Sequence, residues 1–346
     1  MALPAKVQKR ALVTGAGGFI GHHLVKRLKK DGYWVRGADI KAPEFEPSMA
    51  DDFLVVDLRE LPNCRRAVVG VADVYQLAAD MGGIGYITSN FASLSRNNVL
   101  INANMLEAAC QEKVRRYLFT SSACICPSFL QRSEDVGPLR ESDAIPADPE
   151  RGYGWEKLFA EQLVQYYRDD HGLDTRIARL HNVYGPLGTY DGGREKAPAA
   201  ICRKVAEAKA GAAIEVWGDG GQTRSFCYVD DCVEGLTRIM DLDSTEPLNL
   251  GTDERVTVNQ LVDLVCEIAR KPLRKEHDRG KVQGVRGRNS DNSLLRKLLS
   301  WEPKINLRQG LSATYPWIWS QLSRQGRARP PAPEGILQES GVQARA

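Results

Sequence analysis

The chain has 346 residues, of which 42% are hydrophobic and 26% are charged, and its formal net charge is +3. This length allows a sizeable core with two sub-regions, and the composition is that of a globular protein, which excludes a fibre or a disordered chain. The small net charge gives no reason to expect binding to nucleic acid or to an anionic membrane. No apolar run is long enough for a membrane span, and glycines interrupt the apolar run after the basic N-terminus, so no signal peptide is predicted.

The eight cysteines are scattered along the chain. They form no C-x-x-C pair and no Cys/His grouping at zinc spacing, so no metal site is predicted. Reduced thiols in a cytoplasmic protein are the simplest interpretation, and most of these cysteines are expected to be small buried residues.

A glycine turn lies between the first predicted strand, residues 10–14, and a helix-like segment at 22–31. Gly15, Gly18 and Gly21 have G-x-x-G-x-x-G spacing, in which missing side chains let backbone N–H groups and a helix N-terminus meet a pyrophosphate. The sequence therefore indicates a dinucleotide site, although a glycine turn of no special function is the alternative.

The next three predicted strands, at 34–38, 53–56 and 73–77, end next to polar or small residues. Asp39 could accept hydrogen bonds from an adenosine ribose, which favours NAD over NADP, and Asp57 is a candidate for the adenine. Residues 77–82 are candidates for the middle of the cofactor. Each position could instead be an ordinary strand-to-loop junction. A helix at 90–109 and a strand at 116–121 continue the alternation, which predicts a Rossmann-type doubly wound parallel sheet.

The strand at 116–121 leads to Ser122 and Cys124, and a polar loop then leads to Tyr153 and Lys157. The i,i+4 spacing puts the phenol and the ammonium on one face of a helix that is predicted to continue to about His171. An adjacent cation favours the phenolate, so Tyr153 is expected to serve as a base near neutral pH. The alternatives are a surface pair on a helix and a buried structural thiol.

The second half of the chain predicts a smaller mixed α/β region. Residues 8–180 are assigned to an NAD-binding Rossmann domain with returning segments at about 225–252, and the Arg-, Pro- and Gln-rich residues 323–346 to a disordered tail. Residues 181–224 and 253–322 are assigned to a second domain, which the family resemblance described next implies to be nucleotide-sugar-binding.

Residues 10–322 resemble the extended short-chain dehydrogenase/reductase superfamily, in its nucleotide-sugar epimerase/dehydratase branch. The shared strings are Asn-Val-Tyr-Gly-Pro at 182–186, Gly-Asp-Gly with Thr-Arg-Ser-Phe at 218–226, and Trp-Glu-Pro with Gly-Leu at 301–311. Within the branch, hexose 4,6-dehydratases carry an Asp-Glu pair, and simple 4-epimerases a Ser or Thr, where this chain has Cys124. The strings at 122–125, 192–200 and 285–292 look like the GDP-mannose 3,5-epimerase family.

This resemblance implies an enzyme that uses bound NAD to oxidise C4 of a GDP-sugar transiently. Tyr153, assisted by Lys157 and Ser122, would take the C4 hydroxyl proton, and Cys124 and Lys196 would invert C5 and C3 of the 4-keto sugar. Re-reduction at C4 would then give GDP-L-galactose and/or GDP-L-gulose. A 4-epimerase or 4,6-dehydratase with another substrate is the within-class alternative, and a catalytically idle NAD-binding protein is the other.

The resemblance also implies the full set of contact residues. The cofactor would contact Gly15, Gly18, Phe19, Ile20, Gly21, Asp39, Asp57, Leu77, Ala78, Ala79, Tyr153 and Lys157. The substrate would contact Gly82, Gly83, Ser122, Ala123, Cys124, Asn182, Glu195, Lys196, Ala197, Lys204, Gln222, Thr223, Arg224 and Arg288, with Asn182, Lys204, Arg224 and Arg288 at the diphosphate.

Several points stay open at this stage. The sequence does not separate Arg286 from Arg288, or the base from the acid in the Cys124–Lys196 pair. Cys126 stands where the branch usually has Tyr. A homodimer through the helices at 91–109 and 155–171 is expected from relatives.

Overall fold

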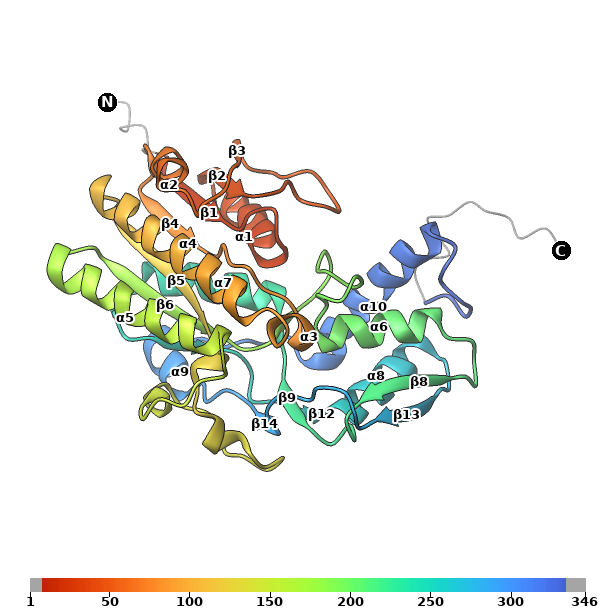
Figure 1. The fold of residues 1–346 in the computed structure, drawn as a ribbon. Helices are drawn as coiled ribbons and strands as arrows, with labels where there is room; N and C mark the ends of the chain where they lie inside the picture. The colour runs from red at the N-terminus through yellow and green to blue at the C-terminus, as the bar shows by residue number, and fades with distance from the viewer. Residues whose placement is uncertain (1–7, 334–346) are drawn as a thin grey trace.

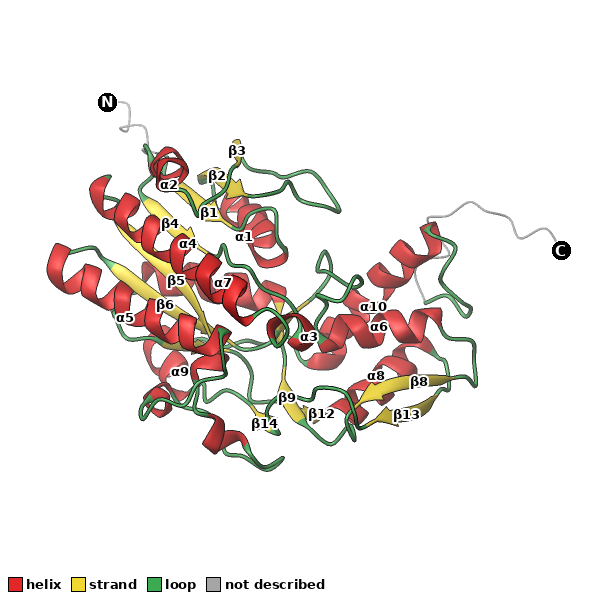
Figure 2. Ribbon diagram, viewed as in Figure 1, coloured by secondary structure: helices red, strands yellow, loops and turns green. Residues whose placement is uncertain are grey.

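A seven-stranded parallel sheet lies at the centre of the protein (Figures 1 and 2). In the computed structural model, which describes residues 8–333, its strand order is β11-β6-β5-β4-β1-β2-β3. The order reverses between β1 and β4, so their carboxyl ends flank the switch point at which ligands bind in such sheets. The strands are β1 (Arg10–Thr14), β2 (Trp34–Asp39), β3 (Asp52–Val55), β4 (Asp73–Gln76), β5 (Arg116–Ser122), β6 (Thr175–Leu180) and β11 (Leu248–Leu250). The predicted doubly wound fold is confirmed.

Helices cover both faces of this sheet. One face packs against α2 (Leu61–Val68), α4 (Phe91–Gln111) and α5 (Tyr153–His171), and the other against α1 (Phe19–Lys30) and α7 (Val229–Asp241) (Figure 1). Successive side chains of a strand point to opposite faces. Leu12 accordingly joins the core under α4 and α5, whereas its neighbour Val13 joins the core under α1 and α7.

The rest of the chain forms a smaller α/β region beside the carboxyl ends of the strands (Figure 2). Leu261 and Leu311 of this region belong to the same apolar cluster as Leu24 and Leu236 beneath the sheet, so one core runs through both parts. Its elements are α6 (Ala197–Glu207), α8 (Val258–Ala269), α9 (Ser293–Leu299), α10 (Leu307–Arg324), the parallel pair β8 (Ala213–Trp217) and β13 (Arg274–Asp278), and the sheet of β9 (Thr223–Ser225), β12 (Arg255–Thr257) and β14 (Gly287–Arg288).

Short elements connect these two regions. They are the helix α3 (Ile84–Ile87), the strand pair β7 (Val183–Tyr184) and β10 (Cys227–Tyr228), and the 3₁₀ turns η1 (Ala123–Ile125), η2 (Ser128–Gln131) and η3 (Glu141–Ala144).

Helix α5 begins at Tyr153 and ends at His171, as the sequence predicts. Gly172 ends it in the left-handed conformation that favours glycine. A Cβ at Gly154 would lie 2.4 Å from the Cys124 carbonyl oxygen, so glycine is needed for α5 to approach η1 this closely. That approach brings Tyr153 next to the Ser122–Cys124 segment.

The prediction of a disordered tail is wrong for residues 323–333, and residues 334–346 lie outside the described part of the chain. Helix α10 continues to Arg324, and the Arg329 amide beyond it donates to the Ala206 carbonyl over 2.9 Å. The sequence of this segment lacks the apolar periodicity that is typical of buried elements. Hydrogen bonds and ion pairs hold the segment in place instead, and these produce no periodic pattern in the sequence.

Candidate active site

A cavity of about 1080 Å³ lies at the carboxyl ends of the strands, between the sheet and α6. It is at the upper end of the volumes of single-ligand pockets, which leaves room for a cofactor beside a substrate. Every residue predicted to contact cofactor or substrate lines it, except Thr223, whose hydroxyl donates to the Glu134 carbonyl over 2.8 Å. The prediction for Thr223 is therefore not supported, because its side chain is engaged with a loop outside the cavity.

The glycine turn forms the cofactor end of the cavity. A Cβ at Gly21 would lie 2.1 Å from the Gly15 carbonyl oxygen, so only glycine lets the start of α1 pack onto the turn. The Gly17 amide donates to Asp39 Oδ2 over 2.9 Å, which orients the carboxylate at the end of β2. Open backbone at a helix N-terminus, followed by an acid at the next strand end, fits the pyrophosphate and adenosine ribose of NAD.

The remaining cofactor residues lie along the sheet edge. Thr14 Oγ1 accepts hydrogen bonds from the Leu77 and Ala78 amides, each over 3.0 Å, and so fixes the segment after β4. Asp57 lines the cavity but is paired with Arg59, whose Nε lies 2.9 Å from Asp57 Oδ1. The Arg59 hydrogen bond lowers the pKa of Asp57, so this carboxylate stays ionised beside the cofactor site.

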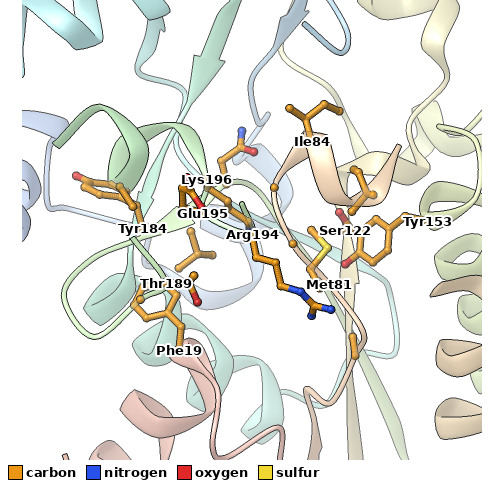
Figure 3. A pocket seen from close by; sticks show the side chains of 18 of the residues that line it. Phe19, Met81, Ile84, Ser122, Tyr153, Tyr184, Thr189, Arg194, Glu195 and Lys196 are labelled. Atoms are coloured by element: carbon orange, nitrogen blue, oxygen red, sulfur yellow. The ribbon is translucent and has the colours of Figure 1, made fainter. Parts of the chain in front are cut away.

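Ser122, Tyr153 and Lys157 meet where β5 ends and α5 begins. Figure 3 shows Ser122 and Tyr153 at one side of the cavity and Glu195 and Lys196 at the other, with the Arg194 side chain extending between them. The Lys157 ammonium lies 5.6 Å from the centre of the Tyr153 ring and donates to the Thr120 carbonyl over 3.2 Å.

The surroundings of Tyr153 oppose the phenolate form that an adjacent Lys157 favours. Burial, followed by the negative charge of Glu156, raises the pKa of Tyr153 well above its usual value, and a hydrogen bond with Ser122 lowers it only in part. Burial also lowers the pKa of Lys157, which weakens its electrostatic influence on the phenol. Deprotonation of Tyr153 therefore needs positive charge beyond what these side chains supply.

Cys124 lies in a polar cluster that joins three distant parts of the chain. Its amide donates to Ser122 Oγ over 3.2 Å, and its Sγ lies 3.4 Å from Arg288 Nη1. The same guanidinium donates through Nε to Gln131 Oε1 over 2.6 Å and pairs through Nη2 with Glu150. Arg288 therefore lines the cavity and contacts the Cys124 thiol, whereas Arg286, which the sequence did not separate from it, pairs with Asp219 and Glu134 outside the cavity.

Burial shifts the pKa values of Cys124 and Lys196 toward each other. Burial and the Glu150 carboxylate raise the pKa of the Cys124 thiol, which Arg288 partly opposes. Burial lowers the pKa of the Lys196 amine, which Cys124 partly opposes. A thiol that stays protonated can donate a proton, and an amine that has lost its proton can accept one. The two groups are therefore suited to opposite roles in a proton transfer.

The other predicted substrate residues already have protein partners. Asn182 Nδ2 donates to the Ser225 carbonyl over 3.0 Å, and Lys204 Nζ lies 3.0 Å from Glu215 Oε2. Arg224 donates to backbone carbonyls, and burial lowers its pKa to about 10. Gln222 lines the cavity and donates through Nε2 to the Trp217 carbonyl over 2.9 Å.

Sequence reasoning missed several residues of the site. Glu150, Arg194 and Trp217 line the cavity, and Gln131 holds Arg288 from outside it. Glu150 and Gln131 stand in a loop without a motif, and their role depends on an arginine more than a hundred residues away. No spacing rule links such positions. Cys126, the departure from the branch pattern, is fully buried and does not line the cavity.

Fold and site together define a nucleotide-sugar enzyme of the short-chain dehydrogenase/reductase type, and comparison with known proteins agrees. Residues 11–251 match the model of the NAD dependent epimerase/dehydratase family, and the chain belongs to this family. It is 47% identical to GDP-mannose 3,5-epimerase of Arabidopsis thaliana over 315 residues, which cover 90% of this chain and 83% of that protein. It is 46% identical to GDP-mannose 3,5-epimerase 1 of Oryza sativa subsp. japonica over 318 residues, covering 91% of this chain and 83% of that protein. The predicted resemblance is confirmed.

Solved structures give the same result. UDP-glucose 4-epimerase of Thermotoga maritima, determined with UDP-glucose, superimposes with a TM-score of 0.82 at 26% identity, covering 90% of this chain and 99% of that one. UDP-glucuronic acid 4-epimerase of Bacillus cereus, determined with UDP-glucuronic acid and NAD, gives 0.77 at 26% identity, with the same coverage. NAD is the cofactor of this chain's family. Among residues 8–333, no helix is long and apolar enough to cross a membrane, and no group of His, Cys, Asp and Glu could hold a metal ion.

Proposed function

We propose that the chain is a GDP-mannose 3,5-epimerase, which converts GDP-mannose to GDP-L-galactose and/or GDP-L-gulose. One observation carries the proposal: Cys124 and Lys196 line the same cavity as Ser122, Tyr153 and Lys157. The first two provide a proton-transfer pair and the last three the hydride-transfer machinery of the family. The identity to proteins of this name supports it.

Oxidation at C4 comes first in the proposed reaction. NAD, held by the glycine turn and Asp39, would supply the acceptor for the C4 hydride and a positive charge that favours the Tyr153 phenolate. Tyr153 takes the proton of the C4 hydroxyl, and Ser122, which interacts with the phenol, helps to hold that hydroxyl. The product of this step is a 4-keto sugar in which the C3–H and C5–H bonds are acidic.

Inversion at C3 and C5 requires that a proton leave one face of the sugar and another arrive at the opposite face. Cys124 in η1, just after β5, and Lys196 at the start of α6 come from separate elements that line the cavity. One takes the proton from carbon and the other returns a proton, and Arg288 stabilises the thiolate state of Cys124 through its contact with Sγ. Return of the hydride to C4 completes the cycle and leaves the cofactor unchanged.

The substrate is held at both ends in this proposal. Gly82 and Gly83 after β4, together with Gln222, bound the sugar. Arg224, Lys204 and Asn182 remain for the diphosphate and nucleoside, while Arg288 is assigned to Cys124 and the sugar because Gln131 and Glu150 hold it there.

The experiment that tests the function is incubation of the full-length protein with NAD and GDP-mannose in heavy water, followed by NMR of the recovered sugar nucleotides. Deuterium at C3 and C5 in inverted products is the expected result. Deuterium at neither carbon contradicts the proposal, and a 4-keto-6-deoxy product would indicate a dehydratase instead.

We also propose that the protein is a homodimer that works in the cytoplasm. Trp155, Phe159 and Tyr166 are 52%, 50% and 54% exposed and share one face of α5, next to α4, so a second copy could cover them. All eight cysteines are free, and a reducing compartment keeps Cys124 in the thiol form that proton transfer needs.

A further inference from the structure

The segment that follows α10 packs against α6 and the loop at 189–196. The Arg329 amide donates to the Ala206 carbonyl over 2.9 Å, and the buried Lys271 Nζ donates to the Arg329 carbonyl over 3.0 Å. Gln325 Nε2 donates to the Tyr190 hydroxyl over 2.9 Å. The segment is therefore attached at both the end of α6 and the start of the loop.

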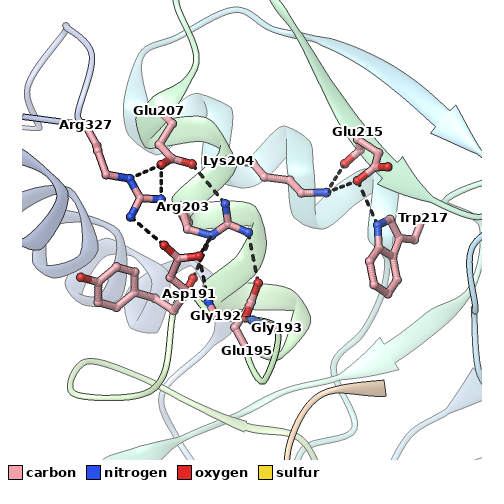
Figure 4. Close-up of polar contacts among 11 residues, drawn as sticks. Asp191, Gly192, Gly193, Glu195, Arg203, Lys204, Glu207, Glu215, Trp217 and Arg327 are labelled. Atoms are coloured by element: carbon pink, nitrogen blue, oxygen red, sulfur yellow. Dashed lines mark hydrogen bonds and ion pairs between the residues drawn. The ribbon is translucent and has the colours of Figure 1, made fainter. Parts of the chain in front are cut away.

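Arg327 connects this segment to the loop through charge. Its Nη1 lies 2.6 Å from Asp191 Oδ2 and its Nε lies 2.8 Å from Glu207 Oε1. Arg203 continues the network, because it contacts Glu207 and Glu195, each over 3.1 Å (Figure 4). Three carboxylates thus share two guanidinium groups.

The network ends one residue before the proposed proton-transfer lysine. Glu195 Oε2 also accepts the Gly193 amide over 2.7 Å, which closes the loop on itself, and Lys196 follows as the N-cap of α6. On the other side, the Gly83 amide donates to the Arg194 carbonyl over 2.9 Å. The position of Lys196 is therefore set from two directions, by the glycines after β4 and by the charges that reach back to Arg327.

We propose that residues 325–329 form a clamp, with Arg327 as a positioning residue, that fixes the loop at 189–196 and so holds Lys196 in place for proton transfer. The inference rests on the proposed function. Arg327 does not line the cavity, so it acts only through Asp191, Glu207 and Arg203. Without its guanidinium, three carboxylates face Arg203 alone, and their mutual repulsion loosens the loop.

The loosened loop is expected to slow the steps that use Lys196 and to spare the step that does not. Proton transfer depends steeply on distance, and a misplacement of about 1 Å can cost two orders of magnitude. For Arg327→Gln we expect deuterium exchange at C3 and C5 of GDP-mannose to fall by about tenfold, because the clamp is partly exposed and loosening is partial. Oxidation at C4 depends on Tyr153, Lys157 and Ser122 on the far wall, so its rate should stay within about twofold.

The test compares Arg327→Gln, Arg327→Lys and the control Arg308→Gln in the full-length protein with NAD. Arg308 on α10 pairs with Glu267, so the control also removes one exposed ion pair of a C-terminal arginine. Two rates are measured after mixing with GDP-mannose in heavy water: the absorbance change of the nicotinamide and deuterium incorporation by NMR. Selective loss of incorporation in Arg327→Gln, recovery in Arg327→Lys and no change in Arg308→Gln are expected.

Two results would overturn the clamp: incorporation at the wild-type rate in Arg327→Gln, or an equal fall in both rates. Should Arg327→Gln fail to fold, Asp191→Asn removes the same contact from the loop side and must give the same selective loss. Wild-type protein that incorporates no deuterium would contradict the proposed function itself. The two failures are thus distinguishable.

Discussion

Cys124 lies near one positive and one negative side chain, whose charges add to and oppose the effect of burial on the pKa of its thiol. Arg288 contacts Sγ over 3.4 Å, and Glu150 pairs with the same guanidinium. The charged and titratable groups around the thiol are Arg288, Glu150, Tyr153, Lys157, Lys196, Arg224 and Cys126.

Glu150→Gln is expected to lower the pKa of the Cys124 thiol. Burial is the first cause of the raised pKa and the Glu150 charge the second, so the amide removes the second cause while it can still hydrogen-bond Arg288. The pH dependence of iodoacetamide reaction at Cys124, read by mass spectrometry, measures the change.

Glu134→Gln is the matched control, because Glu134 pairs with Arg286 outside the cavity. It should leave the reaction profile of Cys124 unchanged. An unchanged or higher thiol pKa in Glu150→Gln would contradict the assigned role of Glu150.

For single residues, the sequence predicts those candidate catalytic side chains whose spacing along the chain places them together. Tyr153 and Lys157 are four positions apart on a helix, and Ser122 and Cys124 adjoin one strand end. Glu150 could not be predicted, since its contact with Arg288 spans 138 positions and depends on the packing of β14 against the loop before α5. Thr223 shows the reverse case. It belongs to a sequence motif of the family, but its hydroxyl donates to the Glu134 carbonyl and does not face the cavity.

At the scale of elements, the junction of β6 and β7 contains a buried histidine. His181 is fully buried, and its Nε2 lies 3.3 Å from Asn249 Oδ1. Burial, followed by the charge of Arg288, lowers the pKa of His181 to about 3. In the unfolded chain a histidine titrates near ~6.5, so the folded state cannot bind the proton that the unfolded state takes up.

The contribution of His181 to the free energy of unfolding should therefore be fully present above pH ~6.5. It should fall as the pH drops from there toward ~3, by at most about 1.4 kcal/mol per pH unit. His181→Gln should show a shallower decline of the unfolding temperature between pH ~6.5 and ~5 than the wild type, whatever its absolute stability. His277→Gln, at an exposed position beside Asn259, is the control and should keep the wild-type slope. Equal slopes for wild type and His181→Gln would contradict the prediction.

The exposed face of α5 gives a second prediction for an element. Phe159→Glu should halve the mass measured by light scattering, because a charge in the centre of an apolar interface is not compensated. Phe129→Glu introduces the same charge at another exposed aromatic, in η2, and should leave the mass unchanged. A wild-type monomer, or a Phe159→Glu variant of unchanged mass, would contradict the proposed α4–α5 interface.

At the scale of the whole molecule, the parallel sheet and its flanking helices could be predicted because alternation of apolar strands and amphipathic helices fixes that architecture. Strand β13 could not. Its sequence, Arg274–Asp278, is entirely charged or basic, and it pairs with β8 in parallel. The order of the segment after α10 could not be predicted either, because it depends on Arg327 and Arg329 meeting α6 across the fold.

In the proposed reaction, one set of residues in the cavity serves the oxidation at C4, and another set serves the inversion at C3 and C5. Comparison of Cys124→Ala with Tyr153→Phe, each with NAD and GDP-mannose in heavy water, tests it most directly. Cys124→Ala should show the nicotinamide absorbance change of the wild type and lose deuterium incorporation at C3 and C5 by about two orders of magnitude or more. Tyr153→Phe should lose both signals. Full deuterium incorporation in Cys124→Ala, or loss of the absorbance change in that variant, would contradict the account.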